Sequence, residues 1–296
     1  MFRKIALSAS ALALSAVAFP GTALADHHGE AASGPALWQV SDEDTTIYLF
    51  GTIHVLPEGE TWFDDRISTA FSSADQLVFE IAMDDVAGMQ AEVAGMAMLP
   101  EGQTLRSLMT EENLSEYEAA LEGFGIPAAA LDPIEPWAAA MTLSLLPLQL
   151  AGWSPEQGVE MQLRAMGEDK ERGALETVEE QIALFDTLPM EAQLEYLDST
   201  VENMPEVVSS LEDLKAEWLE GDDVALGELM NEGMENPEVH ERLLVNRNRN
   251  WVGWIQNRLE EPGTVFIAVG AGHLAGEGSV QDLLAERGLE VERVGH

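Results

Sequence analysis

The chain has 296 residues, of which 54 are acidic and 14 are basic, so its formal net charge is −40, and it contains no cysteine. Nucleic acid and anionic lipid both need a basic surface on their partner, so we expect neither as a ligand. The lack of cysteine excludes disulfides, thiolate metal ligands and a cysteine nucleophile.

The N-terminal segment has the pattern of an export signal. Residues 1–25 contain the basic pair Arg3-Lys4, an apolar run and the small-residue sequence Ala23-Leu-Ala25. These are the three regions of a secretory signal peptide, and the apolar run is shorter than the 18 or so residues that a membrane span needs. We expect cleavage after Ala25, no membrane span in the mature chain, and a periplasmic or secreted protein. A retained membrane anchor is the alternative.

The rest of the chain is long enough for one large domain. Residues 26–36 are small and polar and predict a disordered lead-in, and residues 37–296 predict a single α/β domain. Between about residues 83 and 234 the apolar side chains follow the helical period, which indicates a large helical insertion. Other predicted elements are a hairpin of strands at 36–40 and 45–50, a helix at 62–73, strands at 76–81 and 264–269, helices at 242–259 and 280–287, and an edge strand at 289–294.

Two apolar stretches each end at a glycine that is followed, three residues later, by a histidine. The sequences are Gly51-Thr-Ile-His54 and Gly270-Ala-Gly-His273. A glycine at the end of a buried strand can turn the chain across the carboxyl edge of the sheet, where ligands of α/β proteins bind. We therefore predict a central mixed or parallel sheet in which these two related strand-Gly-x-x-His units bring His54 and His273 to one centre. The alternative is that each imidazole is a hydrogen-bonded structural residue at a turn.

Two glutamates follow short strand-like segments. Glu80 comes at the end of the strand at 76–81, and Glu176 follows the segment that begins at Arg172. A carboxylate at such a position must be exposed at the sheet edge, paired with a cation or bound to a metal. We predict that both point to the same pocket, with Glu80 as a metal ligand and Glu176 as the catalytic base. Pairing of Glu80 with Arg247 is the alternative.

A small basic cluster stands out in this acidic chain. Three arginines lie between Arg242 and Arg249, on the predicted helix at 242–259. The guanidinium of Arg247 is suited to hold a substrate carboxylate or a developing oxyanion, so we predict a catalytic role. The alternative is that Arg247 neutralises the glutamates of the site.

These motifs together resemble the TraB/GumN family, which is related to the Tiki proteases. The resemblance covers essentially the whole mature chain and rests on five short sequences: Gly51-Thr-Ile-His54, Phe79-Glu80, Leu175-Glu176-Thr177, Arg247-Asn248 and Gly270-Ala-Gly-His273. It implies an α/β fold, supporting roles for Gly51, Gly270 and Asn248, and, for Tiki members, a divalent-metal-dependent peptidase. One departure is Gly158-Val-Glu160, where the family has Gly-x-Asp, and the longer side chain argues against a close role for this position.

The expected site contains two imidazoles and one or two carboxylates. This set suits Mn²⁺, Co²⁺, Zn²⁺ or Fe²⁺, and the residues do not choose among them. The chain has neither the His-Glu-x-x-His motif of zincins nor the Gly-x-Ser-x-Gly elbow of serine hydrolases. Our first hypothesis is an exported metal-dependent hydrolase of the peptidase type, acting on a peptide or small-molecule substrate. The alternatives are a non-catalytic periplasmic haem- or ligand-binding protein, and a metal-free esterase with a histidine base that resembles erythromycin esterases.

Overall fold

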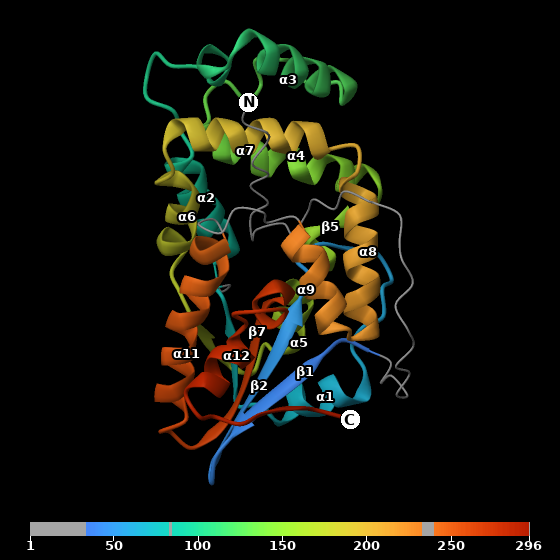
Figure 1. The fold of residues 1–296 in the computed structure, drawn as a ribbon, viewed down its shortest axis with the longest axis vertical. Coiled ribbons are helices and arrows are strands. Elements are labelled where there is room, and N and C mark those ends of the chain that lie inside the picture. The colour runs from blue at the N-terminus through green and yellow to red at the C-terminus, as the bar shows by residue number, and fades with distance from the viewer. Residues whose placement is uncertain (1–33, 83–84, 233–239, 296) are drawn as a thin grey trace.

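The computed structural model describes residues 34–82, 85–232 and 240–295, so the predicted signal peptide and most of the predicted lead-in lie outside it (Figure 1). Within the described residues, no helix has both the length and the apolar character needed to cross a bilayer. The centre is a six-stranded sheet in the order β6-β4-β7-β2-β1-β8. Its strands are β1 (Leu37–Ser41), β2 (Thr45–Thr52), β4 (Gln76–Phe79), β6 (Glu171–Ala174), β7 (Gly263–Gly270) and β8 (Val291–Arg293).

The sheet is mixed, as the sequence predicts. The four neighbours β6, β4, β7 and β2 are parallel, whereas β1 is antiparallel to both β2 and β8. The predicted α/β class with a central mixed sheet is therefore confirmed. A second, two-stranded sheet pairs β3 (Leu56–Pro57) with β5 (Trp153–Ser154).

Strand β7 is buried on both faces, which explains its unbroken apolar sequence. Phe266 and Ala268 pack into one hydrophobic cluster, and Val265, Ile267 and Val269 pack into another on the opposite face. The first cluster joins the sheet to α1 (Asp65–Ser73), α5 (Val159–Met166), α8 (Val207–Glu220) and α9 (Asp223–Glu232), and the second joins it to α11 (Asn246–Arg258) and α12 (Val280–Glu286). Helices on both faces leave the ends of the parallel strands as the place for a site.

Most of the predicted helical insertion packs around a third hydrophobic cluster, separate from the two clusters on the sheet. Trp137, Phe185 and Tyr196 lie at its centre, with their rings stacked at centroid distances of 6.5 and 6.0 Å. Figure 1 shows α3, α4 and α7 above the end of the sheet to which the arrowhead of β2 points. The elements of this layer are α2 (Val86–Met96), the 3₁₀ turn η1 (Leu105–Leu108), α3 (Glu111–Gly123), α4 (Pro136–Leu150), α6 (Val178–Asp186) and α7 (Met190–Asn203).

Several local predictions are confirmed and some boundaries differ. The N-terminal hairpin is present, β8 lies at an edge, and Thr177 caps α6 in a capping box with Glu180. Helix α1 begins at Asp65 rather than at residue 62, because the Asp64 side chain accepts the free N–H groups at its start. The predicted helix at 242–259 begins with a π-helical turn, η3 (Glu241–Val245), and continues as α11. Strand β6 returns from the insertion to the sheet, which confirms the short strand predicted from Arg172.

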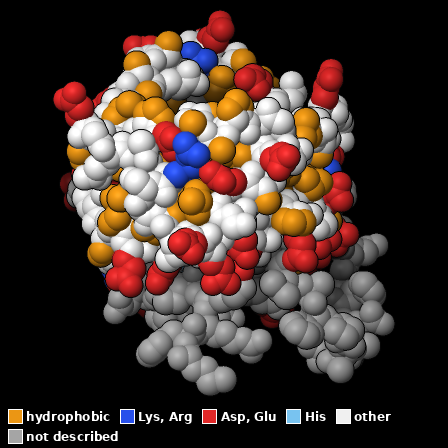
Figure 2. Space-filling view, turned by 90° about the horizontal axis from the view of Figure 1, so that it is seen from above, with side chains coloured by type: hydrophobic (Ala, Val, Ile, Leu, Met, Phe, Trp, Pro, Cys, Tyr) orange, Lys and Arg blue, Asp and Glu red, His pale blue; other side chains and the backbone are white. Residues whose placement is uncertain are grey.

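The acidic residues are distributed rather than gathered. Figure 2 shows Asp and Glu side chains dotted among apolar ones over the face seen from above, with few Lys and Arg side chains. Carboxylates spread in this way are separately hydrated, which limits their mutual repulsion. On this face, the acidic side chains therefore do not mark a site.

Candidate active site

The two Gly-x-x-His sequences lie side by side. Strands β2 and β7 are parallel neighbours in which Gly51 pairs with Val269 and Thr52 pairs with Gly270, so both strands end at the same edge. A β-carbon at Gly51 would lie 3.0 Å from the α-carbon of Ala271. Glycine at this position therefore lets the 3₁₀ turn η4 (Ala271–Leu274), which carries His273, pack directly against β2.

His273 is held in one tautomer by the residue beside Arg247. The amide nitrogen of Asn248 donates to the carbonyl of Gly278 at 2.9 Å, which leaves its Oδ1 to accept from Nδ1 of His273 at 2.5 Å. The other ring nitrogen, Nε2, lies 2.9 Å from Nη1 of Arg247. Because a guanidinium only donates, Nε2 must be the unprotonated acceptor. The predicted supporting residue Asn248 thus directs a lone pair of His273 into the site.

His54 is held in the same way by a carboxylate. Its Nδ1 lies 2.6 Å from Oε1 of Glu160, which also accepts from the hydroxyl of Thr52. A β-carbon at Gly158 would lie 2.1 Å from the carbonyl oxygen of His54, so glycine is required for α5 to approach this turn. Glu160 is therefore in direct contact with the site, and the expectation that its longer side chain argues against a close role is wrong.

Glu80 lies between the two histidines. Its Oε1 accepts from the backbone N–H of Gly270 at 2.7 Å and is 3.8 Å from Nε2 of His273. A β-carbon at Gly270 would be 3.2 Å from this Oε1 and 3.4 Å from Nε2 of His54. Gly270 thus leaves space beside Oε1 of Glu80 and Nε2 of His54, while Nε2 of His273 approaches the same carboxylate oxygen; that the two imidazoles share one centre stays a prediction.

Arg247 contacts three other residues of the cluster, Glu80, Glu176 and His273. Its Nη2 donates to Oε2 of Glu80 at 2.6 Å and also to Glu176, whose two carboxylate oxygens both lie 3.1 Å from Nε. The guanidinium carbon also lies 4.8 Å from the ring centre of Trp251, a cation–π contact. Each guanidinium nitrogen therefore has a partner inside the protein. This geometry is that of the alternative in which Arg247 neutralises the glutamates.

Gln181 joins the two glutamates and was not predicted. Its amide nitrogen donates to Oε2 of Glu80 at 2.9 Å and to Oε1 of Glu176 at 3.0 Å. It lies one turn into α6, four residues after the Thr177 cap. A glutamine on an ordinary capped helix carries no sequence signal of a site; only its spacing from Glu176 and the cap could have suggested that it faces inward.

The two histidines have opposite pKa shifts. Burial lowers the pKa of His54, but the charge and hydrogen bond of Glu160 outweigh it and raise the pKa to about 9. For His273, burial and then the Arg247 guanidinium hold the pKa well below its usual range. Without any further ligand, His54 is therefore a cation at neutral pH and His273 is neutral.

The pKa values of Glu80 and Glu176 also shift in opposite directions. Burial raises the pKa of Glu80, but Arg247 and the two imidazoles outweigh it and lower the pKa to about 2. For Glu176, burial is the largest influence and the pKa is raised, although the hydrogen bonds from Arg247 oppose it. Neighbouring carboxyls whose pKa values are pushed apart are a sign of divided acid and base roles. The charge resides on Glu80, and Glu176 is the group better suited to exchange a proton.

The donor set has the chemistry of a metal site. Both imidazoles present Nε2 and are oriented through Nδ1 by an oxygen acceptor, the arrangement that commonly orients metal-binding histidines. Glu80 and His273 are 3.8 Å apart, a separation that two ligands at about 2.0–2.2 Å from one ion can span. Among the residues that the structure describes, however, no three His, Asp or Glu side chains are grouped closely enough to hold an ion as they stand. The chemistry of the donors fits a metal, and their arrangement is incomplete.

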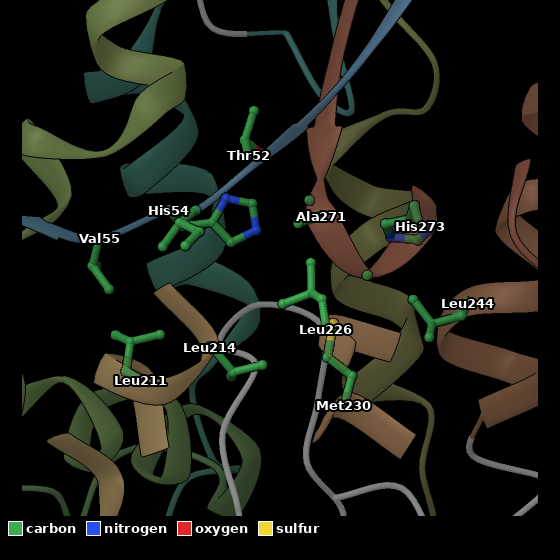
Figure 3. A pocket seen from close by; sticks show the side chains of 13 residues that line it. Thr52, His54, Val55, Leu211, Leu214, Leu226, Met230, Leu244, Ala271 and His273 are labelled. Atoms are coloured by element: carbon green, nitrogen blue, oxygen red, sulfur yellow. The ribbon is translucent and has the colours of Figure 1, made fainter. Parts of the chain in front are cut away.

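An apolar pocket adjoins the cluster. Figure 3 shows His54 and His273 on either side of Ala271, with apolar side chains of α8 and α9 facing them across the pocket. Its lining residues are Thr52, Ile53, His54, Val55, Leu211, Leu214, Leu226, Met230, Leu244 and the segment 270–273. The histidines are therefore at the boundary between a charged cluster and an apolar cavity.

Comparison with known proteins places this arrangement in a family. The sequence model of the TraB/PrgY/gumN family matches residues 36–293. The chain belongs to this family. The resemblance inferred from the short motifs is thereby confirmed, and the match covers all of the described strands.

The relatives of this family member include one with a named activity. YbaP of Escherichia coli K12, which is described as uncharacterized, is 26% identical over 80% of this chain and 87% of its own. An uncharacterized protein of Treponema pallidum is 22% identical over 85% of this chain and 80% of its own. The metalloprotease TIKI1 of Danio rerio is 25% identical over 86% of this chain and 62% of its own. No solved structure matches the chain.

Proposed function

We propose that this protein is an exported hydrolase of the peptidase type whose reacting centre lies between His54, Glu80 and His273. The observation that carries the proposal is the paired anchoring of the imidazoles. Glu160 and Asn248 hold the two Nδ1 atoms, which leaves Nε2 of His54 beside Gly270 and Nε2 of His273 beside Glu80 and Arg247. Catalytic groups can act together on one substrate bond only if their side chains are held in fixed orientations. The similarity to a metalloprotease supports the reaction class.

In this proposal the residues of the cluster have separate roles in the hydrolysis of an amide. Glu176 takes a proton from the attacking water as the new carbon–oxygen bond forms, and gives it to the amine as the carbon–nitrogen bond breaks. Glu80 stays ionised because Arg247 is paired with it. Arg247 also fixes the position of the Glu176 carboxylate through Nε and Nη2.

We propose that a divalent ion is part of the working enzyme, with His54, His273 and Glu80 as its ligands. Such an ion polarises a carbonyl and lowers the pKa of bound water toward about 7. Two features of the protein favour binding of the ion: Glu80 is ionised, and the lone pair of His273 is on Nε2. Mn²⁺, Co²⁺, Zn²⁺ and Fe²⁺ all accept this ligand set.

The two alternative functions have less support. A histidine base would require His54 to lose its proton or Arg247 to release Nε2 of His273, and metal binding requires the same changes, so the similarity to a metalloprotease is what favours the metal-dependent reaction. A haem needs a flat apolar slot, whereas the pocket beside the histidines has a volume of about 60 Å³ and ligand sites usually enclose about 300–1,000 Å³. We therefore favour the hydrolase.

The test is a peptide-library digest with the mature protein. We expect cleavage that a chelator abolishes and that one of the four divalent ions restores, together with no Soret band on haem titration. Cleavage that a chelator leaves intact would support the metal-free esterase or peptidase. A strong Soret band without any cleavage would support the haem-binding alternative.

A further inference from the structure

The pocket beside the histidines is apolar in an otherwise acidic protein. Its volume of about 60 Å³ is several times the about 10–15 Å³ that one water molecule needs. None of the described residues that line it is Asp, Glu, Lys or Arg, although the chain contains 54 acidic residues. A cation placed in it would lose its hydration without gaining a partner of opposite charge, and an anion would meet only His54, which is already paired with Glu160.

The walls of the pocket come from two helices and the π-helical turn. Leu211 and Leu214 belong to α8, Leu226 and Met230 to α9, and Leu244 to η3. Helix α8 is itself tied to the end of β2, since the indole nitrogen of its Trp218 donates to the carbonyl of Gly51 at 2.8 Å. The apolar wall is therefore fixed relative to the strand that delivers His54.

Met230 forms an adjustable side of the pocket. A β-carbon at Gly272 would lie 2.1 Å from Cε of Met230, so the end of this side chain lies directly against the turn that carries His273. Methionine is unbranched and adapts to differently shaped neighbours. Its terminal atoms can move to widen the cavity without a change in the backbone of α9.

We propose that this pocket is a specificity subsite, which takes a leucine- or methionine-sized side chain of a peptide substrate at a residue flanking the scissile bond. The inference rests on the proposed hydrolase function and adds the substrate class. The argument for this occupant is continuity: His54, Gly270 and His273 belong both to the cluster and to the lining of the pocket. A side chain one or two bonds from the reacting carbonyl therefore enters the cavity directly.

The experiment uses labelled hexapeptides that differ at one position flanking the cleaved bond, which holds Leu, Met, Gly, Lys or Glu. We measure kcat/KM for each peptide and, separately, the dissociation constant by fluorescence anisotropy. Burial of a Leu or Met side chain should favour those peptides over the Gly peptide by about 10-fold or more in both measurements. The Lys and Glu peptides should rank no better than the Gly peptide.

A charge introduced into the pocket should reverse the preference. Met230 is half-buried and packs against the edge of the core, so Met230→Glu adds a carboxylate to the wall, and the Tm of the variant is measured to check its fold. We expect this variant to prefer the Lys peptide to the Leu peptide. The matched control is Val224→Glu on the same helix, where the side chain is 65% exposed and the preference should stay as in the wild type.

The outcomes separate this inference from the proposed function. Equal kcat/KM values for all five peptides, or an unchanged preference in Met230→Glu, would overturn the subsite and leave the hydrolase standing. No cleavage of any peptide would count against the hydrolase, and the dissociation constants would then decide the subsite alone. Equal dissociation constants for the Leu and Lys peptides would overturn the proposed subsite.

Discussion

Nη1 of Arg247 donates a hydrogen bond to Nε2 of His273 at a distance of 2.9 Å. This nitrogen has one lone pair in the ring plane, and a guanidinium has no acceptor to offer in exchange. A metal ion can bind His273 through Nε2 only if Arg247 moves away from it. In the absence of metal, Arg247 therefore supplies the positive charge that the buried carboxylates need.

Arg247→Met should destabilise the metal-free protein strongly. The change leaves the buried Glu80 and Glu176 without their cation, and breaking such a pair costs about 3–5 kcal/mol. Added Mn²⁺ should raise Tm more in the variant than in the wild type, because the ion replaces the lost charge. Thermal unfolding with and without Mn²⁺ measures both effects.

Arg249→Met is the control for this prediction. Arg249 lies on the same helix and pairs with Glu241, but both side chains are nearly half exposed. An exposed ion pair contributes about 0–1 kcal/mol, so Tm should change little. A loss of stability as large as that of Arg247→Met would contradict the role given to the buried arginine.

Glu160→Gln should reduce activity while the fold is retained. The change removes the carboxylate that accepts from Nδ1 of His54, and loss of such an orienting partner typically lowers metal affinity or activity by about 10–100-fold. Glu160→Asp tests the length of the side chain, since the shorter carboxylate keeps the charge. Glu156→Gln, at an exposed position just before α5, is the control that should behave as the wild type. Equal turnover in Glu156→Gln and Glu160→Gln would show that Glu160 does not support the site.

Gly158→Ala should separate α5 from the turn that carries His54. The new methyl group would lie 2.1 Å from the carbonyl oxygen of His54, so backbone must shift, at a cost of about 1–3 kcal/mol. Gly253→Ala is the counterpart in α11, where the added methyl meets no atom within 4 Å. That change should stabilise the helix by about 0.5–1 kcal/mol. Denaturant unfolding of both variants checks the opposite signs, and a stabilised Gly158→Ala would contradict the close packing.

Glu80→Gln and Glu176→Gln should have different consequences. Glu80, whose carboxylate faces His273, is the proposed ligand, so its amide variant should lose bound metal. Glu176 is the proposed base, and its amide variant should keep the metal and lose about 10²–10⁴-fold in turnover. Metal content by mass spectrometry and turnover by peptide cleavage are measured on the same preparations. The reverse result would exchange the two roles, and no effect in either would remove both residues from the site.

The sequence predicts the sheet because its strands depend on local patterns, and it places both histidines at one edge; that they share one centre stays a prediction. The apolar runs around Ile47 and Ile267, and the glycines that end them, are visible in the sequence, and parallel pairing brings their histidines to one edge. Glu80 is recognisable because a carboxylate at the end of an apolar strand needs a partner. The apolar runs, the glycines and Glu80 can all be recognised from residues that are adjacent in the sequence.

The remaining parts of the site depend on how separate elements dock. Glu160 lies 106 positions from His54 in the sequence, and only the packing of α5 on the His54 backbone makes this contact. Gln181 reaches Glu80 across 101 positions in the same manner. A π-helical turn precedes the helix that carries Arg247, and nothing in the helical period of the sequence distinguishes it from an ordinary helix.

The most direct test of the central claim is peptide turnover by His273→Ala, with His240→Ala as control. If the cluster is the hydrolytic centre, His273→Ala should abolish chelator-sensitive cleavage, while His240→Ala cleaves as the wild type does. Because the change removes a buried ring that bonds Asn248 and Arg247, it should also lower the Tm of the metal-free protein, so folding of the variant is checked by circular dichroism. Wild-type turnover by a folded His273→Ala variant would show that the reaction, if any, takes place elsewhere.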